Sequence, residues 1–234
     1  VARPLTPPFT DPRFPLGTDQ LGRDVLAGLL HGARVSLGVG ATAAAAAILV
    51  GILVGTLAGF SGRLVDDVLM RITEAFQTVP TFLLALALVS VLGASATNVV
   101  LAIAISSWPP TARLVRAEVL RLRHADYVDA ARLAGRAPLA IAFVELLPGA
   151  VQPVIALIGI TVGEAILVES ALAFLGLSDP NLTSWGAMIA NGRALIRNAP
   201  YLVIIPGIAI ALAVLAASLT GDALGRRMRL VGHR

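Results

Sequence analysis

Two long stretches without a charged side chain constrain the fold of this sequence more than any other feature. The first covers residues 35–62 and the second residues 75–112. With a rise of about 1.5 Å per residue, a helix over the first stretch easily crosses a hydrocarbon core of about 30 Å. One helix over the second would be roughly 57 Å long, which is too long for a single span. The polar, small residues at 93–98 therefore predict a hairpin between two spans.

Five membrane-spanning helices are expected in all, so the predicted fold is an all-α, polytopic membrane helix bundle. The sequence is 57% hydrophobic and only 14% charged, which is too apolar for a protein whose surface faces water. A membrane β-barrel is excluded because runs such as residues 43–47 and 209–217 are apolar at every position, without the alternation of a membrane strand. The expected spans cover residues 35–60, 75–93, 98–113, 147–175 and 200–220.

Arginine supplies every positive charge outside histidine, and its distribution orients the helices. Cytoplasmic loops carry an excess of basic residues, so the arginine-rich loop between the third and fourth spans and the tail at 223–234 are assigned to the cytoplasm. Alternation then makes residues 1–34 an N-terminal external segment. An external start needs a preceding span or signal, and residues 1–34 contain neither, so we expect a truncated or misassigned start.

A polar segment at 126–148 lies on the cytoplasmic side in this topology. Residues 127–133 are predicted to form a short helix, and Gly135 is predicted to end it, because glycine often follows a helix C-terminus. Small side chains on such a helix would allow it to enter a groove of another protein. The alternative is a loop whose arginines only set topology and bind anionic lipid headgroups.

The same segment resembles the signature of permease subunits in binding-protein-dependent ABC importers. That family's pattern is Glu-Ala-Ala, three residues, Gly, nine residues and Ile-x-Leu-Pro, and here the spacing is kept in Asp129-Ala-Ala-x-x-x-Gly135-x9-Glu145-Leu-Leu-Pro148. Asp129 replaces the usual Glu, and Glu145 replaces the usual Ile. Further blocks are similar to the dipeptide, oligopeptide and nickel permeases, namely residues 16–25, 32–37, 174–177, 184–188 and 219–224.

The resemblance implies a permease subunit that forms the translocation pathway for peptides or nickel in a bacterial or archaeal inner membrane, with a cytoplasmic C-terminus. The implied partners are a second permease subunit in a heterodimer, two cytoplasmic ABC ATPase subunits, an extracytoplasmic substrate-binding protein and the lipid bilayer. An additional N-terminal span that is usual in this group is absent from residues 1–34. The residues implied to couple to the ATPase are Asp126, Tyr127, Asp129, Ala130, Ala131, Arg132, Gly135 and Pro148.

Catalysis by this chain is not expected, and no cofactor, metal site or nucleic-acid partner is expected either. Without Lys the sequence cannot contain the Gly-x-x-x-x-Gly-Lys-Ser/Thr phosphate loop, so ATP hydrolysis would belong to a partner. The three histidines are dispersed and there is no Cys, which argues against a zinc site.

Glu164 and Glu169 fall inside an expected span, where a carboxylate is costly and usually faces protein or water. They are candidate pathway residues, with hydrogen bonding to a neighbouring helix as the alternative. Two other functions stay open for the whole chain. A secondary transporter would use such intramembrane charges without an ATPase. A purely structural membrane subunit would tolerate changes at Asp129, Ala131 or Gly135.

Overall fold

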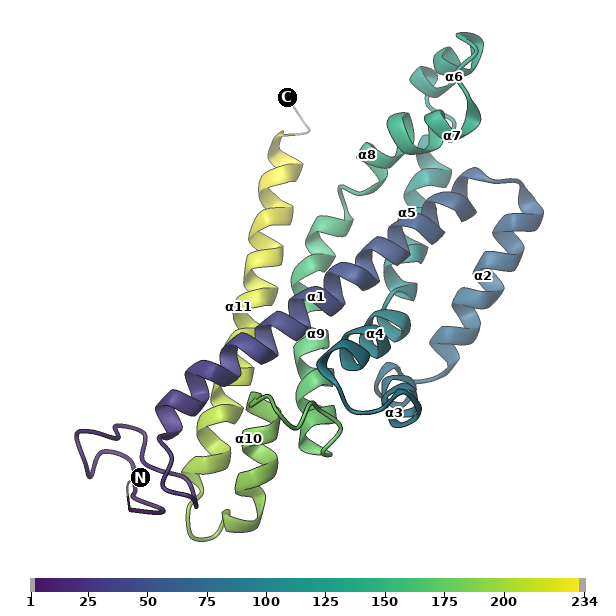
Figure 1. Ribbon diagram of the computed structural model, residues 1–234. Helices are drawn as coiled ribbons and strands as arrows, with labels where there is room; N and C mark the ends of the chain where they lie inside the picture. The colour runs from purple at the N-terminus through teal and green to yellow at the C-terminus, as the bar shows by residue number, and fades with distance from the viewer. Residues whose placement is uncertain (1–2, 232–234) are drawn as a thin grey trace.

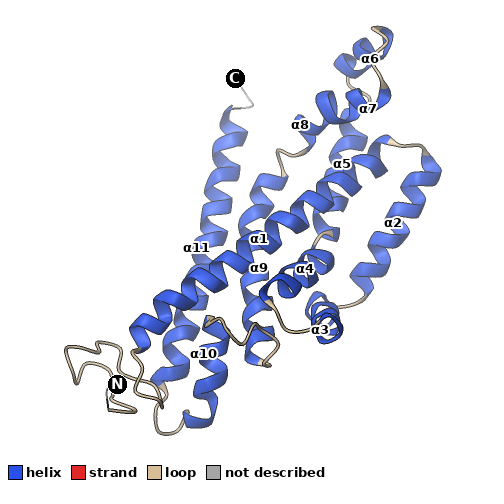
Figure 2. Ribbon diagram, in the orientation of Figure 1, coloured by secondary structure: helices blue, strands red, loops and turns tan. Residues whose placement is uncertain are grey.

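The computed structural model describes residues 3–231, and every regular element in this range is a helix (Figures 1 and 2). The long helices cross one another in a bundle, with the N-terminal loops at one end and α6 at the other (Figure 1). The helices are α1 (Val25–Phe60), α2 (Arg63–Thr78), α3 (Thr81–Leu92), α4 (Ala96–Ser107), α5 (Pro109–Leu122), α6 (Asp126–Leu133), α7 (Pro138–Ala140), a π-helix (Ile141–Leu146), α8 (Leu147–Ala150), α9 (Val154–Phe174), α10 (Trp185–Gly192), a 3-10 helix (Arg193–Leu195) and α11 (Tyr201–Val231).

Three of the described helices are long and apolar enough to cross a membrane, namely α1, α9 and α11. The pair α2 and α3 would make a fourth span, but the two helices meet at a bend of 88°. The expected count of five spans is therefore not confirmed, although the all-helical membrane fold is.

Prolines explain why the expected spans at 75–93 and 98–113 are divided. Val79 is extended, with φ −91° and ψ 127°, because the ring of Pro80 disfavours a helical residue before it. Pro109 and Pro110 occupy the first turn of α5, where a missing N–H costs nothing. The chain therefore starts a new helix directly after Pro80 and another at Pro109, instead of continuing through either site.

The first helix begins at Val25, well before the expected start at residue 35. Asp24 caps it, because the Asp24 carboxylate accepts a hydrogen bond from the Leu26 N–H at 2.9 Å. The described part of the N-terminal segment is folded against α11, where the Tyr201 hydroxyl donates to the Thr18 carbonyl at 2.7 Å. At the other end of the chain, α11 extends beyond the expected limit at 220, and residues 232–234 of the predicted tail lie outside the described range.

Glycines bring α1 and α5 close together. A Cβ atom added to Gly51 would lie 2.6 Å from the Thr111 Cβ, and one added to Gly59 would lie 2.8 Å from the Val119 Cβ. Gly55 lies between them and faces Val115 in the same way. Small residues at every fourth position let two helix backbones approach closely, so α1 and α5 form a tight pair.

Candidate functional site

Helix α6 projects from one end of the bundle and is held by a single buried side chain (Figure 1). Val128 is fully buried and belongs to a hydrophobic cluster with Val115 and Val119 of α5 and Leu146 of the π-helix. Ala131 packs against the same cluster from one turn further along. The helix is therefore attached to the π-helix and α5 along one narrow face, and its other residues are mostly exposed.

Most of the residues predicted to couple to an ATPase lie on this free surface. Ala131 is partly buried, and the other seven predicted residues are exposed. The exposed ones are Asp126, Tyr127, Asp129, Ala130, Arg132, Gly135 and Pro148. Beside them Leu133 is 91% exposed, so this end of the helix presents an apolar side chain to its surroundings.

Gly135 ends α6, as the sequence predicts. Its φ of +74° lies in the left-handed region that favours glycine. The Gly135 N–H donates to the Arg132 carbonyl at 3.0 Å, and the Arg136 N–H donates to the Ala131 carbonyl at 3.1 Å. This pair of bonds is the Schellman arrangement, which satisfies two carbonyls that the helix end would otherwise leave free. Atoms other than its chain neighbours lie more than 4 Å from the position of an added Cβ, so the site is open as well as exposed.

The return from α6 to the bundle passes through a π-helix, a rare element that is frequent at functional sites. The Leu147 N–H that follows it bonds to the Ala142 carbonyl, five residues back. Pro148 has no N–H and cannot form the next α-helical bond, which helps to explain the wider turn here. Arg136 forms an ion pair with Glu145 across this return. Glu145, the residue that departs from the family pattern, thus ties the end of α6 to the π-helix.

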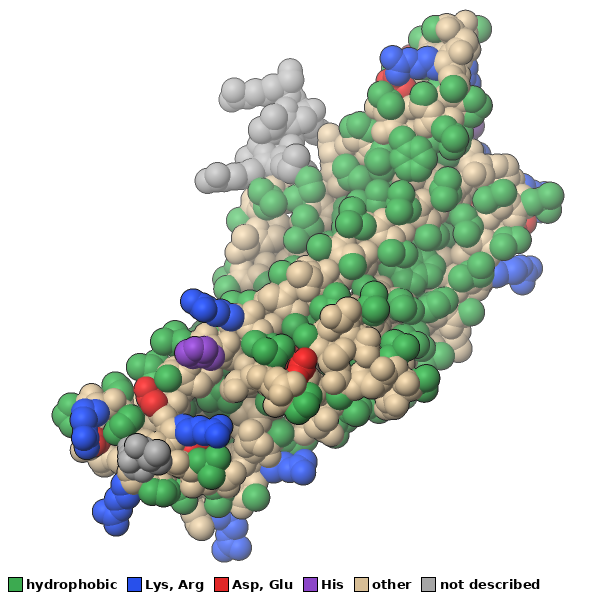
Figure 3. Space-filling view, in the orientation of Figure 1, with side chains coloured by type: hydrophobic (Ala, Val, Ile, Leu, Met, Phe, Trp, Pro, Cys, Tyr) green, Lys and Arg blue, Asp and Glu red, His purple; other side chains and the backbone are tan. Residues whose placement is uncertain are grey.

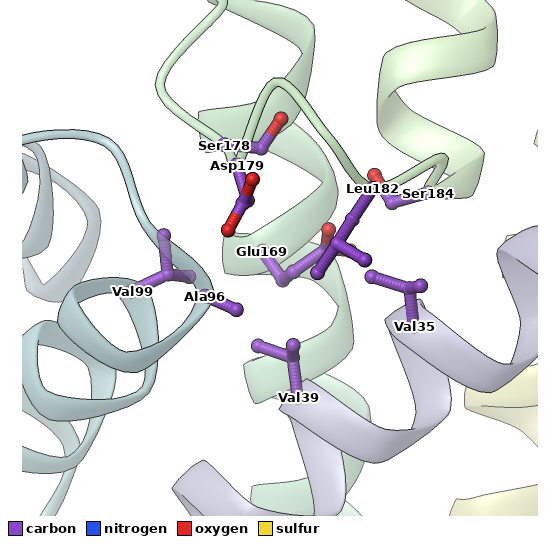
Figure 4. A pocket seen from close by; sticks show the side chains of 9 residues that line it. All are labelled: Val35, Val39, Ala96, Val99, Glu169, Ser178, Asp179, Leu182 and Ser184. Carbon is purple, nitrogen blue, oxygen red and sulfur yellow. The ribbon is translucent and has the colours of Figure 1, made fainter.

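The two candidate pathway carboxylates have different surroundings. Glu164 on α9 is partly exposed, whereas Glu169 is 2% exposed. Ser36 of α1 donates a hydrogen bond to the Glu169 carboxylate at 3.1 Å, and Ser170 donates another at 3.3 Å. The Trp185 N–H of α10 in turn donates to the Ser36 hydroxyl at 3.2 Å. Figure 4 shows Glu169 at a small pocket between α1, α4 and the loop that precedes α10.

Several residues of the site were missed by reasoning from the sequence. Val128 was not singled out, although it is the apolar residue in an otherwise polar turn, and that contrast could have identified it. Ser36 gives no such signal, because its partner Glu169 is 133 residues away. The bond between Arg136 and Glu145 could have been suspected from the acidic residue at a position where the related pattern has Ile.

Apolar side chains cover much of the middle of the face seen in Figure 3. The exposed apolar residues of α1 include Leu49 and Leu53. A contiguous apolar exterior of this kind suits contact with lipid or with another membrane subunit.

Residues 51–230 match the protein family described as "Binding-protein-dependent transport system inner membrane component". The di/tripeptide transport system permease protein DppC of Pseudomonas aeruginosa is 44% identical over 225 residues, which cover 94% of this chain and 74% of that protein. The nickel transport system permease protein NikC of Escherichia coli is 40% identical over 211 residues, which cover 89% of this chain and 76% of that protein. Among solved structures, a chain of the inward-facing MetNI methionine ABC transporter has a TM-score of 0.70 at 16% identity and covers 86% of this chain and 96% of its own length. This last likeness concerns the fold.

Proposed function

The chain belongs to the family of binding-protein-dependent transport system inner membrane components, and on that premise we propose that α6 is the element through which it engages a cytoplasmic ATPase. It is a multi-pass membrane permease subunit of an ABC importer, and it is not catalytic, because the ATPase is a separate subunit. Family membership sets aside the secondary transporter and the purely structural subunit. The family also implies a substrate-binding protein as a partner.

The projection of α6 carries this proposal. A short helix with exposed Tyr127, Ala130 and Leu133 offers apolar contact area, and the small alanine lets a groove wall approach. Asp129 and Arg132 pair with each other at 2.9 Å, so the rim of this surface carries both signs of charge. Charged groups at a rim contribute to orientation more than to affinity.

The proposed cargo is a short peptide or nickel, delivered by the binding protein. The relatives named for di/tripeptide and for nickel transport are 44% and 40% identical, and both cover most of this chain. We also propose a heterodimer with a second permease subunit, supported by the exposed apolar exterior of α1. The arginine-rich ends of α5 and α11 support a cytoplasmic location for α6 and for the C-terminus.

For Glu169, the hydrogen bonds favour a role in joining α1 to α9 over direct contact with cargo. Its carboxylate already accepts bonds from Ser36 and Ser170 and is 2% exposed. Glu164 lies in the same helix and is partly exposed, and we propose it as a residue of the translocation pathway.

Substitution of Gly135 by Trp tests the ATPase-docking proposal. We expect Gly135→Trp to reduce recovery of the ATPase subunits with the permease by about tenfold or more, since the bulky side chain stands on the docking surface. Gly93→Trp is the matched control, because Gly93 also has a positive φ, at +92°, and open space around its Cβ position. Normal recovery of the ATPase with Gly135→Trp, or an equal loss with Gly93→Trp, would contradict the proposal.

A further inference from the structure

Asp66 of α2 and Arg116 of α5 form a two-point ion pair. The Arg116 Nε lies 2.5 Å from Asp66 Oδ1, and the Arg116 Nη2 lies 2.7 Å from Asp66 Oδ2. The two side chains are 16% and 33% exposed, respectively, so the contact is largely sheltered from solvent. Among the ion pairs whose side chains the structure describes, in residues 3–226, this one joins residues 50 apart in the sequence, whereas every other pair spans nine residues or fewer. Two parallel bonds between planar groups fix orientation as well as distance.

Helix α2 is joined to α1 by a two-residue link, and the Arg113 guanidinium of α5 donates a hydrogen bond to the Gln77 amide oxygen at 2.8 Å. Its packing is otherwise light. Thr73 is its one fully buried residue in the described structure. The face toward the bundle is a stripe at helical spacing that consists of Asp66, Leu69, Met70, Thr73 and Phe76. Near the far end of α2, Phe76 stacks edge-on against Trp108, with ring centroids 5.4 Å apart. The cytoplasmic half of α2 is therefore positioned by its link to α1 and, toward α5, by the ion pair.

Helix α5 connects this ion pair to the docking helix. Val115 and Val119 lie on either side of Arg116 in the sequence, and both pack in the cluster that buries Val128 of α6. The same segment of α5 is held tightly against the glycines of α1. A displacement of α6 is thus passed through the π-helix and this cluster to the α1 and α5 pair, and Arg116 is the charged side chain through which α5 contacts α2.

We propose that Asp66 and Arg116 are positioning residues that transmit movement of α6 to α2 and, across the bend at Pro80, to α3. This inference rests on the proposed docking role of α6. Loss of either charge removes this side-chain link between α5 and α2, so ATP hydrolysis continues with less transport per ATP. Reversal of both charges restores the attraction and with it the transmission.

The test uses the complete importer, with both permease subunits, the ATPases and the binding protein reconstituted in lipid vesicles. We expect Asp66→Asn and Arg116→Gln to keep ATPase activity and to lower transport per ATP by about tenfold, a typical size for lost coupling between sites. The double variant Asp66→Arg with Arg116→Asp is expected to recover transport. Asp67→Asn is the matched control, because the pair of Asp67 with Arg63 is on the same helix but 61% and 94% exposed.

A distance measurement separates transmission from mere stability. The chain has no Cys, so spin labels can be placed at Val68→Cys on α2 and Ala117→Cys on α5, both exposed positions, with the partner subunits freed of cysteine. With Asp66 and Arg116 unmodified, the distribution of distances between the two labels should stay narrow and unchanged in every nucleotide state. With Asp66→Asn it should change or broaden when ATP binds.

The inference is overturned if the single variants transport as much per ATP as the unmodified importer. It is also overturned if Asp66→Asn leaves the distance between the labels unchanged. If the neutral variants do not assemble, the test rests on the double variant Asp66→Arg with Arg116→Asp. Transport by this double variant supports the inference, and its failure to assemble or to transport counts against the inference. Failure of the proposed function is recognised separately, because then Gly135→Trp would leave recovery of the ATPase with the permease unchanged.

Discussion

The Ser36 hydroxyl on α1 donates a hydrogen bond to the Glu169 carboxylate on α9, at 3.1 Å, across 133 residues of sequence. The same hydroxyl accepts the Trp185 N–H at 3.2 Å, so one serine joins three helices. Buried polar groups are costly when they lose a partner, and this network therefore fixes how α1, α9 and α10 meet.

Removal of the Glu169 carboxylate should weaken this junction. Glu169→Ala leaves the Ser36 and Ser170 hydroxyls without their acceptor, and we expect the free energy of unfolding to fall by about 1–3 kcal/mol. Glu169→Gln retains an acceptor oxygen, so its free energy of unfolding should fall much less. Thermal unfolding in detergent measures the difference, and equal melting temperatures for the two variants would show that the hydrogen bonds do not hold the junction.

Close packing of α1 on α5 should make Gly55 intolerant of even one methyl group. We expect Gly55→Ala to lower stability by about 1–3 kcal/mol, because the added Cβ meets Val115 and the backbone of α5. Gly38→Ala on the same helix has open space and should raise stability by about 0.5–1 kcal/mol. Melting temperatures that shift in the same direction for both variants would argue against the close contact.

The anchor and the free face of α6 should respond differently to truncation. Val128→Ala removes buried methyl groups, and we expect α6 to lose about 1–3 kcal/mol of attachment and its protection from hydrogen exchange. Leu133→Ala should leave exchange unchanged in the isolated permease and reduce ATPase recovery, because Leu133 is 91% exposed. Hydrogen exchange by mass spectrometry checks both, and a loss of protection with Leu133→Ala would contradict this division of roles.

The ion pair between Arg136 and Glu145 should restrain the segment that follows α6. Glu145→Arg places two positive charges together, and we expect faster hydrogen exchange between residues 135 and 146. The doubly reversed variant with Arg136→Glu should return to the original exchange rate. The effect on melting temperature should be small, because partly exposed ion pairs contribute about 0–1 kcal/mol.

Local features of this fold were accessible from the sequence, and contacts between distant residues were not. The end of α6 at Gly135 follows from this glycine and its neighbours in the sequence. The apolar runs predict helices because that signal, too, lies within a continuous stretch of sequence. The start of α1 at Val25 was missed, because Asp24 caps it within a stretch that otherwise resembles a loop. The division of two expected spans depends on how Pro80 and Pro109 are accommodated. The pairing of Asp66 with Arg116 requires the packing of two helices and has no signature in either one.

The bend of 88° means that α2 and α3 cannot both stand along the membrane normal. A helix laid crosswise contributes its diameter of about 10–12 Å to the thickness of the insulating layer, and not its length. Whichever of the two lies crosswise, lipid or other helices must fill the rest of the hydrocarbon core of about 30 Å at that place.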